Sequence, residues 1–142
     1  MTIDTEAPVR IRTDEPAPVA DPEDLGRRRR AAVAQAVAQA DPAASGHHRA
    51  AVGVRRYAPG SVALALRGRF DRVGRERLRA LAADVERQAR TELVIDLSGL
   101  EHCDSGLARV LGRLRIRCLA HGARVELTDP PEALAAELGH RS

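Results

Sequence analysis

The sequence contains no lysine and no tryptophan, and only two aromatic residues, Tyr57 and Phe70. All 23 basic residues are therefore arginine. With so few aromatic side chains, the core has to be built from aliphatic residues and alanine. The chain also lacks the aromatic platform on which single-stranded nucleic acid stacks, and a net charge of +3 is too small to indicate nucleic-acid binding by itself.

Cysteine is scarce as well, because Cys103 and Cys118 are too few for a disulfide framework. The N-terminus is acidic and rich in proline, whereas a secretory signal begins with basic residues followed by an apolar run. No run reaches the ~18 apolar residues that a transmembrane helix needs. We therefore expect a reduced, cytoplasmic protein without stable membrane insertion, and nothing in the pattern calls for more than a monomer.

At 142 residues the chain has room for one domain and a tail. Residues 1–50 are predicted to form a disordered, acidic and proline-rich tail that carries a basic, alanine-rich helix near 25–40. Its arginine run, Arg27–Arg30, indicates either contact with an anionic surface, such as a membrane or nucleic acid, or a solvated helix start beside the acidic tail. The folded domain is expected at 51–142.

Strands and helices alternate through this domain. Strands are predicted at 51–58, 61–70, 92–98 and 123–128, and helices from Asp71 onward, at about 105–121 and at 131–138. Pro59-Gly60 is typical of a hairpin turn between the first two strands. The order ββαβαβα predicts an α/β fold, with helices packed on a mixed sheet of about four strands that includes parallel neighbours.

The stretch 92–121 joins a short apolar strand to an amphipathic helix through an acidic corner. The apolar positions of the helix recur at i, i+3, i+4, i+7 and i+11. Asp104 or Ser105 is the expected N-cap, and Gly122 is the expected terminator. The Ser105 hydroxyl would then lie at the positive end of a helix, where it can serve as a cap or carry a phosphoryl group.

Several motifs in this order resemble those of STAS domains, in particular the bacterial anti-sigma factor antagonists. That family's pattern is a strand ending Asp-Leu-Ser-Gly, followed by Asp-Ser-x-Gly-Leu and preceded by a Gly-Glu-Leu-Asp turn. The matching segments are Gly68-Arg-Phe-Asp71, Leu93-Val-Ile-Asp-Leu-Ser-Gly-Leu100, Asp104-Ser105-Gly106-Leu107, Arg124-Val-Glu-Leu-Thr128 and Pro131-Glu-Ala-Leu134. The resemblance covers about Ala51–Gly139 and implies a STAS-like fold.

The resemblance also implies a function. A family member of this kind binds an anti-sigma factor that has serine kinase activity, releases a sigma factor, and loses its affinity when Ser105 is phosphorylated. ATP would be bound by the partner, so the chain itself would need no cofactor or metal and would not be an enzyme. The implied partner-binding residues are Asp71, Asp104, Ser105, Gly106, Arg109 and Arg113. From spacing alone, Arg109, Arg113 and Arg117 form a basic stripe that suits an acidic partner or a solvated face.

One departure from the family pattern falls on the functional position, because Asp104-Ser105-Gly106 is one residue shorter than Asp-Ser-x-Gly. Counted from the strand, Asp104 and Ser105 match the family's aspartate and phosphoacceptor. Counted back from the helix, Cys103 and Asp104 take those places, and a fixed negative charge would replace the switch. This register leaves open a non-switching STAS scaffold, a subunit of a membrane transporter or of another signalling complex.

Two chemical alternatives are weaker. A hydrolytic triad of Ser105, His102 and Asp96 or Asp71 lacks the Gly-x-Ser-x-Gly elbow, and its histidine lies three residues from the serine. A zinc site from His102, Cys103, Cys118 and His121 would need ligands from both ends of a helix ~24 Å long.

Overall fold

The computed structural model describes residues 21–40, 50–102, 104–132 and 134–135. Its elements are α2 (Pro22–Gln39), β1 (Ala51–Ala58), β2 (Ser61–Arg69), α3 (Arg72–Gln88), β3 (Glu92–His102), α4 (Ser105–Ala120) and β4 (Arg124–Thr128). Residues 132, 134 and 135 are also helical, within the short helix predicted after Pro131. The predicted tail, as far as residue 20, lies outside the described residues. Cys103 lies outside them as well.

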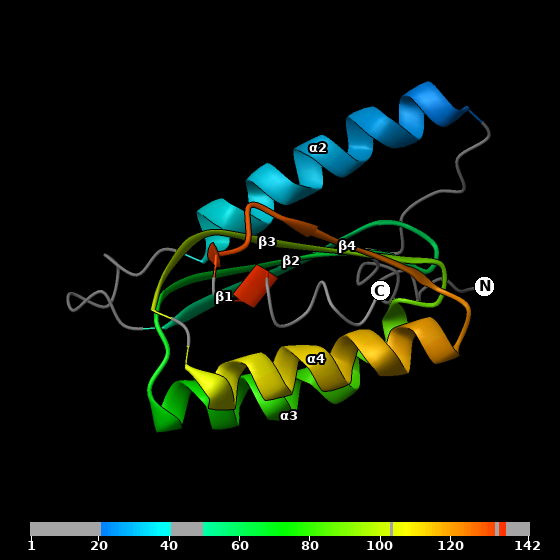
Figure 1. Cartoon of the computed structure of the whole chain (residues 1–142). Coiled ribbons are helices and arrows are strands. Elements are labelled where there is room, and N and C mark those ends of the chain that lie inside the picture. Colours follow the sequence, from blue (N-terminus) through cyan, green and yellow to red (C-terminus); the bar gives the residue numbers. More distant parts are fainter. Residues whose placement is uncertain (1–20, 41–49, 103, 133, 136–142) are drawn as a thin grey trace, which may run out of the picture.

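The strands form one mixed sheet in the order β1-β2-β3-β4, which confirms the predicted fold class. β1 and β2 are antiparallel and joined at Pro59-Gly60, where Gly60 takes a φ of 79° that suits glycine. The pairs β2 with β3 and β3 with β4 are parallel. Because α3 and α4 connect these parallel strands, they lie side by side on one face of the sheet, whereas α2 lies on the other (Figure 1).

The main core lies between the sheet and the pair α3 and α4. Leu93, Ile95 and Leu97 alternate along β3 and are buried in this core. Leu107, Leu111, Leu114 and Cys118 of α4 and Leu78 and Val85 of α3 pack in the same cluster. Each fully buried aliphatic side chain contributes about 1.5–3 kcal/mol, so an aliphatic core can hold this domain without tryptophan.

β3 continues four residues beyond the predicted end at Ser98. The Asp96 carboxylate accepts hydrogen bonds from the Ser98 backbone N–H at 3.0 Å and from its hydroxyl at 2.6 Å. The register with β2 shifts here and then resumes with Gly99 opposite Arg67. The Ser-Gly step predicted a strand end, but it is a local irregularity inside a longer strand.

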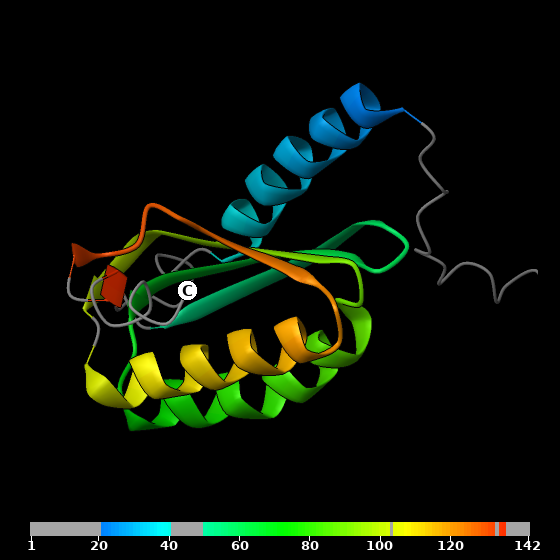
Figure 2. The same ribbon diagram turned by 45° about the vertical axis from the view of Figure 1, so that its right-hand side comes forward.

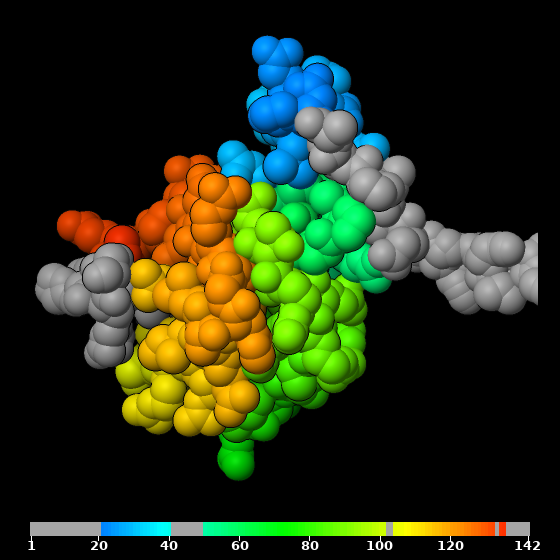
Figure 3. All heavy atoms as spheres, turned by 90° about the vertical axis from the view of Figure 1, so that its right-hand side faces the viewer, coloured from blue at the N-terminus to red at the C-terminus, as the bar shows by residue number. Residues whose placement is uncertain are grey.

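α2 begins at Pro22, three residues before the predicted start. Asp21 caps it, accepting from the Glu23 N–H at 3.0 Å, and Glu23 and Asp24 place negative charge in its first turn. Ala32, Ala36 and Ala40 are buried, and they share a second apolar cluster with the strand residues Tyr57, Ala58, Ala63 and Ala65. These alanines dock α2 on the sheet, and Leu25 near its start packs against the same cluster. The N-terminal end of the helix rises above the rest of the molecule (Figure 3).

Two of the four consecutive arginines fasten α2 to the sheet. Arg28 donates to the Tyr57 carbonyl at 3.4 Å, and Arg29 lies 3.1 Å from both Glu92 and Glu126. Glu92 is buried and also accepts from the Tyr57 hydroxyl. Burial, and then the Glu92 carboxylate, raise the pKa of Tyr57. Arg27 pairs with Asp24. The run is thus mainly a set of docking contacts rather than a free basic patch.

Close packing of α2 depends on Gly53 of β1. A Cβ added there would lie 1.9 Å from the Ala36 carbonyl oxygen, so helix and strand would have to separate. We expect Gly53→Ala to lower the free energy of unfolding by about 1–3 kcal/mol, measured by urea denaturation. The matched control is Gly26→Ala within α2, where the nearest atom would lie at 3.6 Å and the change should stabilise the helix by about 0.5–1 kcal/mol. Wild-type stability of Gly53→Ala would contradict this close approach.

The buried thiol of Cys118 gives a prediction for alkaline pH. Burial, and then the negative charge of Glu86, raise its pKa from 9.0 to about 11. The folded state therefore holds this proton more tightly than the unfolded state, and stability should fall as the pH rises from about 9 to about 11. Relative to Cys118→Ala, the wild-type chain should lose on the order of 1–3 kcal/mol across this range. If the free energy of unfolding in urea depends on pH in the same way for the wild type and Cys118→Ala, the thiol does not contribute.

Candidate functional site

Asp71, Asp104, Ser105 and Gly106 of the predicted site lie where α3 and α4 begin. α3 follows β2 and α4 follows β3, and both helices start at the same end of the sheet (Figure 2). Asp71 caps α3 by accepting from the Gly74 N–H at 2.9 Å, and Asp104 caps α4 by accepting from the Leu107 N–H at 2.9 Å. The sequence left Asp104 and Ser105 open as the cap of α4, and the structure assigns this role to Asp104. A helix was expected to begin at Asp71, and the fold brings the two helix starts together.

Ser105 is the first residue of α4 and is exposed to solvent. Because the Asp104 carboxylate makes the cap, the neighbouring serine hydroxyl is not needed for that role. The hydroxyl lies at the electropositive end of a helix of 16 residues, where the first N–H groups favour an anion. An exposed hydroxyl in this position can carry a phosphoryl group.

Arg75 joins the two helix starts, and sequence reasoning missed it. Its Nη1 atom lies 3.0 Å from Oδ2 of Asp104, 29 residues away along the chain. A Cβ added at Gly106 would lie 2.7 Å from Arg75 Nε, so this glycine lets the guanidinium cross closely over the first turn of α4. No local pattern could indicate this pair, because it depends on how α3 packs against α4.

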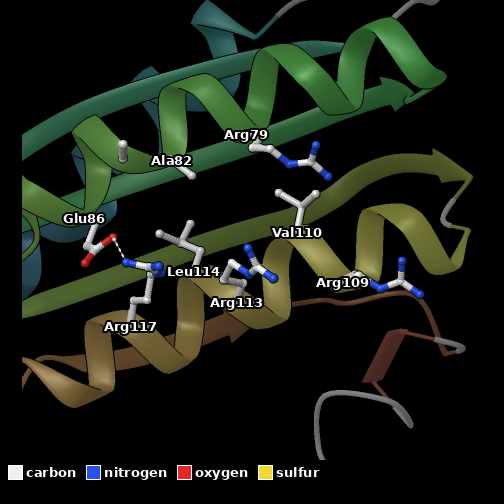
Figure 4. A pocket seen from close by; sticks show the side chains of 9 residues that line it. Arg79, Ala82, Glu86, Arg109, Val110, Arg113, Leu114 and Arg117 are labelled. Carbon is white, nitrogen blue, oxygen red and sulfur yellow. Dashed lines mark ion pairs between the residues drawn. The ribbon is translucent and has the colours of Figure 1, made fainter.

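The predicted basic residues Arg109 and Arg113 are exposed on α4, as is Arg117. Arg117 lies 3.7 Å from Glu86 of α3, which also contacts His121 at 2.9 Å. All three arginines line a groove between α3 and α4 (Figure 4). They extend the predicted partner surface away from Ser105 along the helix.

The described residues do not bring a metal centre together. Within the described ranges, no three histidine, cysteine, aspartate or glutamate side chains lie close enough to hold a metal ion. Asp96, one candidate for a hydrolytic triad, is buried and bonded to Ser98. Cys103 lies outside the described residues, as does the side chain of His102.

None of the helices in the described part of the chain is long and apolar enough to cross a membrane.

The two contacts of Asp104 can be separated by substitution. Asp104→Ala removes both the cap and the ion pair, and should lower the free energy of unfolding by about 1 kcal/mol. Asp104→Asn keeps an oxygen for the Leu107 N–H and loses only the charge facing Arg75. Because that pair is partly exposed, we expect a change below about 0.5 kcal/mol. Urea denaturation measures both, and equal losses in the two variants would show that the ion pair, not the cap, dominates.

Two solved structures and one protein family are similar to parts of this chain. Two solved structures are similar in part: "Crystal Structure Analysis of Mglu", with 26% identity and a TM-score of 0.48, and "Crystal Structure Analysis of Mglu in its native form", with 25% identity and a TM-score of 0.46. They match 56% and 55% of this chain, which spans only 19% and 22% of their lengths. No curated protein matches the chain. The family described as "Mlab, STAS domain" matches residues 54–139, more than half of the sequence, and the protein therefore belongs to the STAS domain family.

Proposed function

We propose that this STAS domain is an anti-sigma factor antagonist. In this role it binds an anti-sigma factor that has serine kinase activity, so that a sigma factor is released. The partner binds ATP and transfers its terminal phosphoryl group to the Ser105 hydroxyl, after which the two proteins separate. The chain acts by binding and not by catalysis.

The observation that carries this proposal is the position of Ser105. Ser105 is exposed and is the first residue of α4. The helix is capped by the neighbouring residue, Asp104. A kinase can reach such a hydroxyl without unfolding the helix. Counted from β3, the same residue also matches the phosphoacceptor of the family pattern.

The charges around Ser105 support a switch. The unmodified hydroxyl is neutral and adjoins the paired charges of Arg75 and Asp104. A phosphoryl group adds about −1.5 to −2 charges at neutral pH. A partner surface that fits the neutral hydroxyl would then face added negative charge, and like charges brought together in an interface cost several kcal/mol.

An exposed apolar side chain near the site suits protein binding. Val73 lies in the first turn of α3 and is 62% exposed, the largest exposure among the large apolar residues described. Arg75, two residues later on this helix, contacts Asp104 beside Ser105. Because the centre of a protein interface is apolar, Val73 would favour a partner that covers this helix start.

The switch is tested on Ser105 itself. Incubation with candidate anti-sigma kinases and ATP, followed by peptide mass spectrometry, should place one phosphate on Ser105 and none on Ser105→Ala. Ser98→Ala is the matched control, because Ser98 is also exposed and should not affect the reaction. Ser105→Asp should weaken binding of the same partner by at least about tenfold, measured by calorimetry, while Ser105→Ala should bind normally. Absence of phosphate with every candidate kinase, or tight binding by Ser105→Asp, would contradict the proposal.

A non-switching STAS scaffold of a membrane transporter or other complex is the second candidate. The observation in its favour is that Asp104, not Ser105, occupies the N-cap of α4 and supplies a fixed negative charge there. The arginine run adds little support, because Arg28 and Arg29 contact the sheet. Co-purification of an ATPase and a permease with the chain, unchanged by Ser105→Ala, would favour this function over the switch.

A further inference from the structure

We infer that the groove between α3 and α4 docks an acidic, amphipathic helix of the partner protein. This inference names the chemistry of the partner surface and thus rests on the proposed function. It concerns a different part of the surface from Ser105, and it can be tested without phosphorylation.

The groove has an apolar floor and basic rims. Its volume is about 300 Å³. Ala82 and Ala83 of α3 and Val110 and Leu114 of α4 provide apolar atoms between the helices. The basic side chains around it are Arg79, Arg109, Arg113 and Arg117, and Glu86 is the one acidic residue among the described residues that line it. In Figure 4 the guanidinium groups lie along the groove on both helices. Such a surface fits a segment with carboxylates beside aliphatic side chains.

The rim charges are available to a partner. Among the described residues, no carboxylate pairs with Arg109 or Arg113. Arg79 pairs with Glu76 on the same helix, and both side chains are 58% exposed. Exposed pairs of this kind contribute little, so the pair can exchange for a partner carboxylate at small cost. Glu86 is already engaged by Arg117 and His121, which reduces its repulsion of an acidic ligand.

The spacing of the rim favours a helix as the occupant. Arg109, Arg113 and Arg117 repeat every fourth residue, which places them about 6 Å apart along α4. A partner helix laid along the groove can present carboxylates at the same interval, with aliphatic residues between them facing Val110 and Leu114. Amphipathic helices recognise apolar grooves through anchors with this periodicity. A groove of this size that opens along its length gives a lipid chain little enclosure.

Arg109, which lines the groove, lies one helical turn from Ser105. Ser105 and Arg109 are four residues apart and therefore share one face of α4. Ile116, which is 54% exposed, lies on the same side of the helix further along. A partner that covers Ser105 can extend along α4 and place its acidic helix between the two rims.

The test uses the full-length chain and a synthetic probe. The probe is a fluorescein-labelled alanine-based helix in which glutamate repeats every fourth residue beside a row of leucines. A probe with glutamine in place of glutamate is the control. Fluorescence anisotropy at low salt should show binding of the glutamate probe, weaker binding of the glutamine probe, and a loss of affinity on adding salt.

Charge reversal on the groove should be specific. The double variant Arg109→Glu, Arg113→Glu should lose at least about tenfold in affinity for the glutamate probe. Arg30→Glu, Arg77→Glu changes the net charge equally at exposed helical positions outside the groove, and should bind within about twofold of the wild type. Ala83→Phe, at an exposed lining position, should weaken binding without changing charge. Circular dichroism confirms that each variant is folded.

Several results would overturn the inference. The first is that the glutamate probe does not bind. The second is that both charge-reversed variants lose affinity for it equally, and the third is that Ala83→Phe does not change its affinity. Binding of phosphatidylglycerol vesicles that requires Arg109 and Arg113, without binding of the probe, would assign the groove to lipid instead. Probe binding that survives in Ser105→Ala, together with no kinase that modifies Ser105, would remove the switch and keep the groove. Phosphorylation of Ser105 without probe binding would keep the switch and remove the groove as a docking site.

Discussion

The parallel pairing of β2 with β3 determines where the residues of the proposed partner-binding site lie. Two parallel neighbours have to be joined by a crossing element, here α3, and the next parallel pair requires α4 on the same face. Both helices therefore begin at the carboxyl ends of adjacent strands. Asp71, Asp104 and Ser105 lie at these two helix starts for that reason, although more than thirty residues separate the first two.

Much of this arrangement could be predicted because it depends on local patterns. The apolar period of α4, a short acidic side chain before each of α3 and α4, and the Pro59-Gly60 turn each act within a few residues. The hairpin, the helix start at Asp71 and the mixed sheet were predicted correctly from these signals, and Asp104 was one of the two caps expected for α4. The exposure of Ser105 follows from the same reasoning, because a residue at the first helical position can avoid the apolar face.

Other features could not be predicted because they arise from contacts between distant segments. Arg75 is one of many arginines on exposed helix positions, and only the packing of α3 against α4 brings it to Asp104. α2 packs on the sheet largely through alanine side chains on both surfaces. Alanine in a sequence does not distinguish a buried helix face from an exposed one. Arg29 and Arg30 are adjacent members of one arginine run, yet Arg29 reaches Glu92 and Glu126 on the sheet. In such cases the register of packing, and not the residue type, decides the contact.

The shared face of Ser105 and Arg109 links the switch to the groove. A phosphoryl group on Ser105 would attract nearby guanidinium groups, and charge-assisted bonds from arginine to phosphate are about twice as strong as neutral hydrogen bonds. Arg75, which lies over the first turn of α4, and Arg109, one turn further on, are the arginines placed to respond. Phosphate would then take Arg75 from Asp104 and draw Arg109 from the rim that faces the partner's carboxylates. One modification would thereby add negative charge at the helix start and remove positive charge from the groove, and both changes disfavour the same acidic partner.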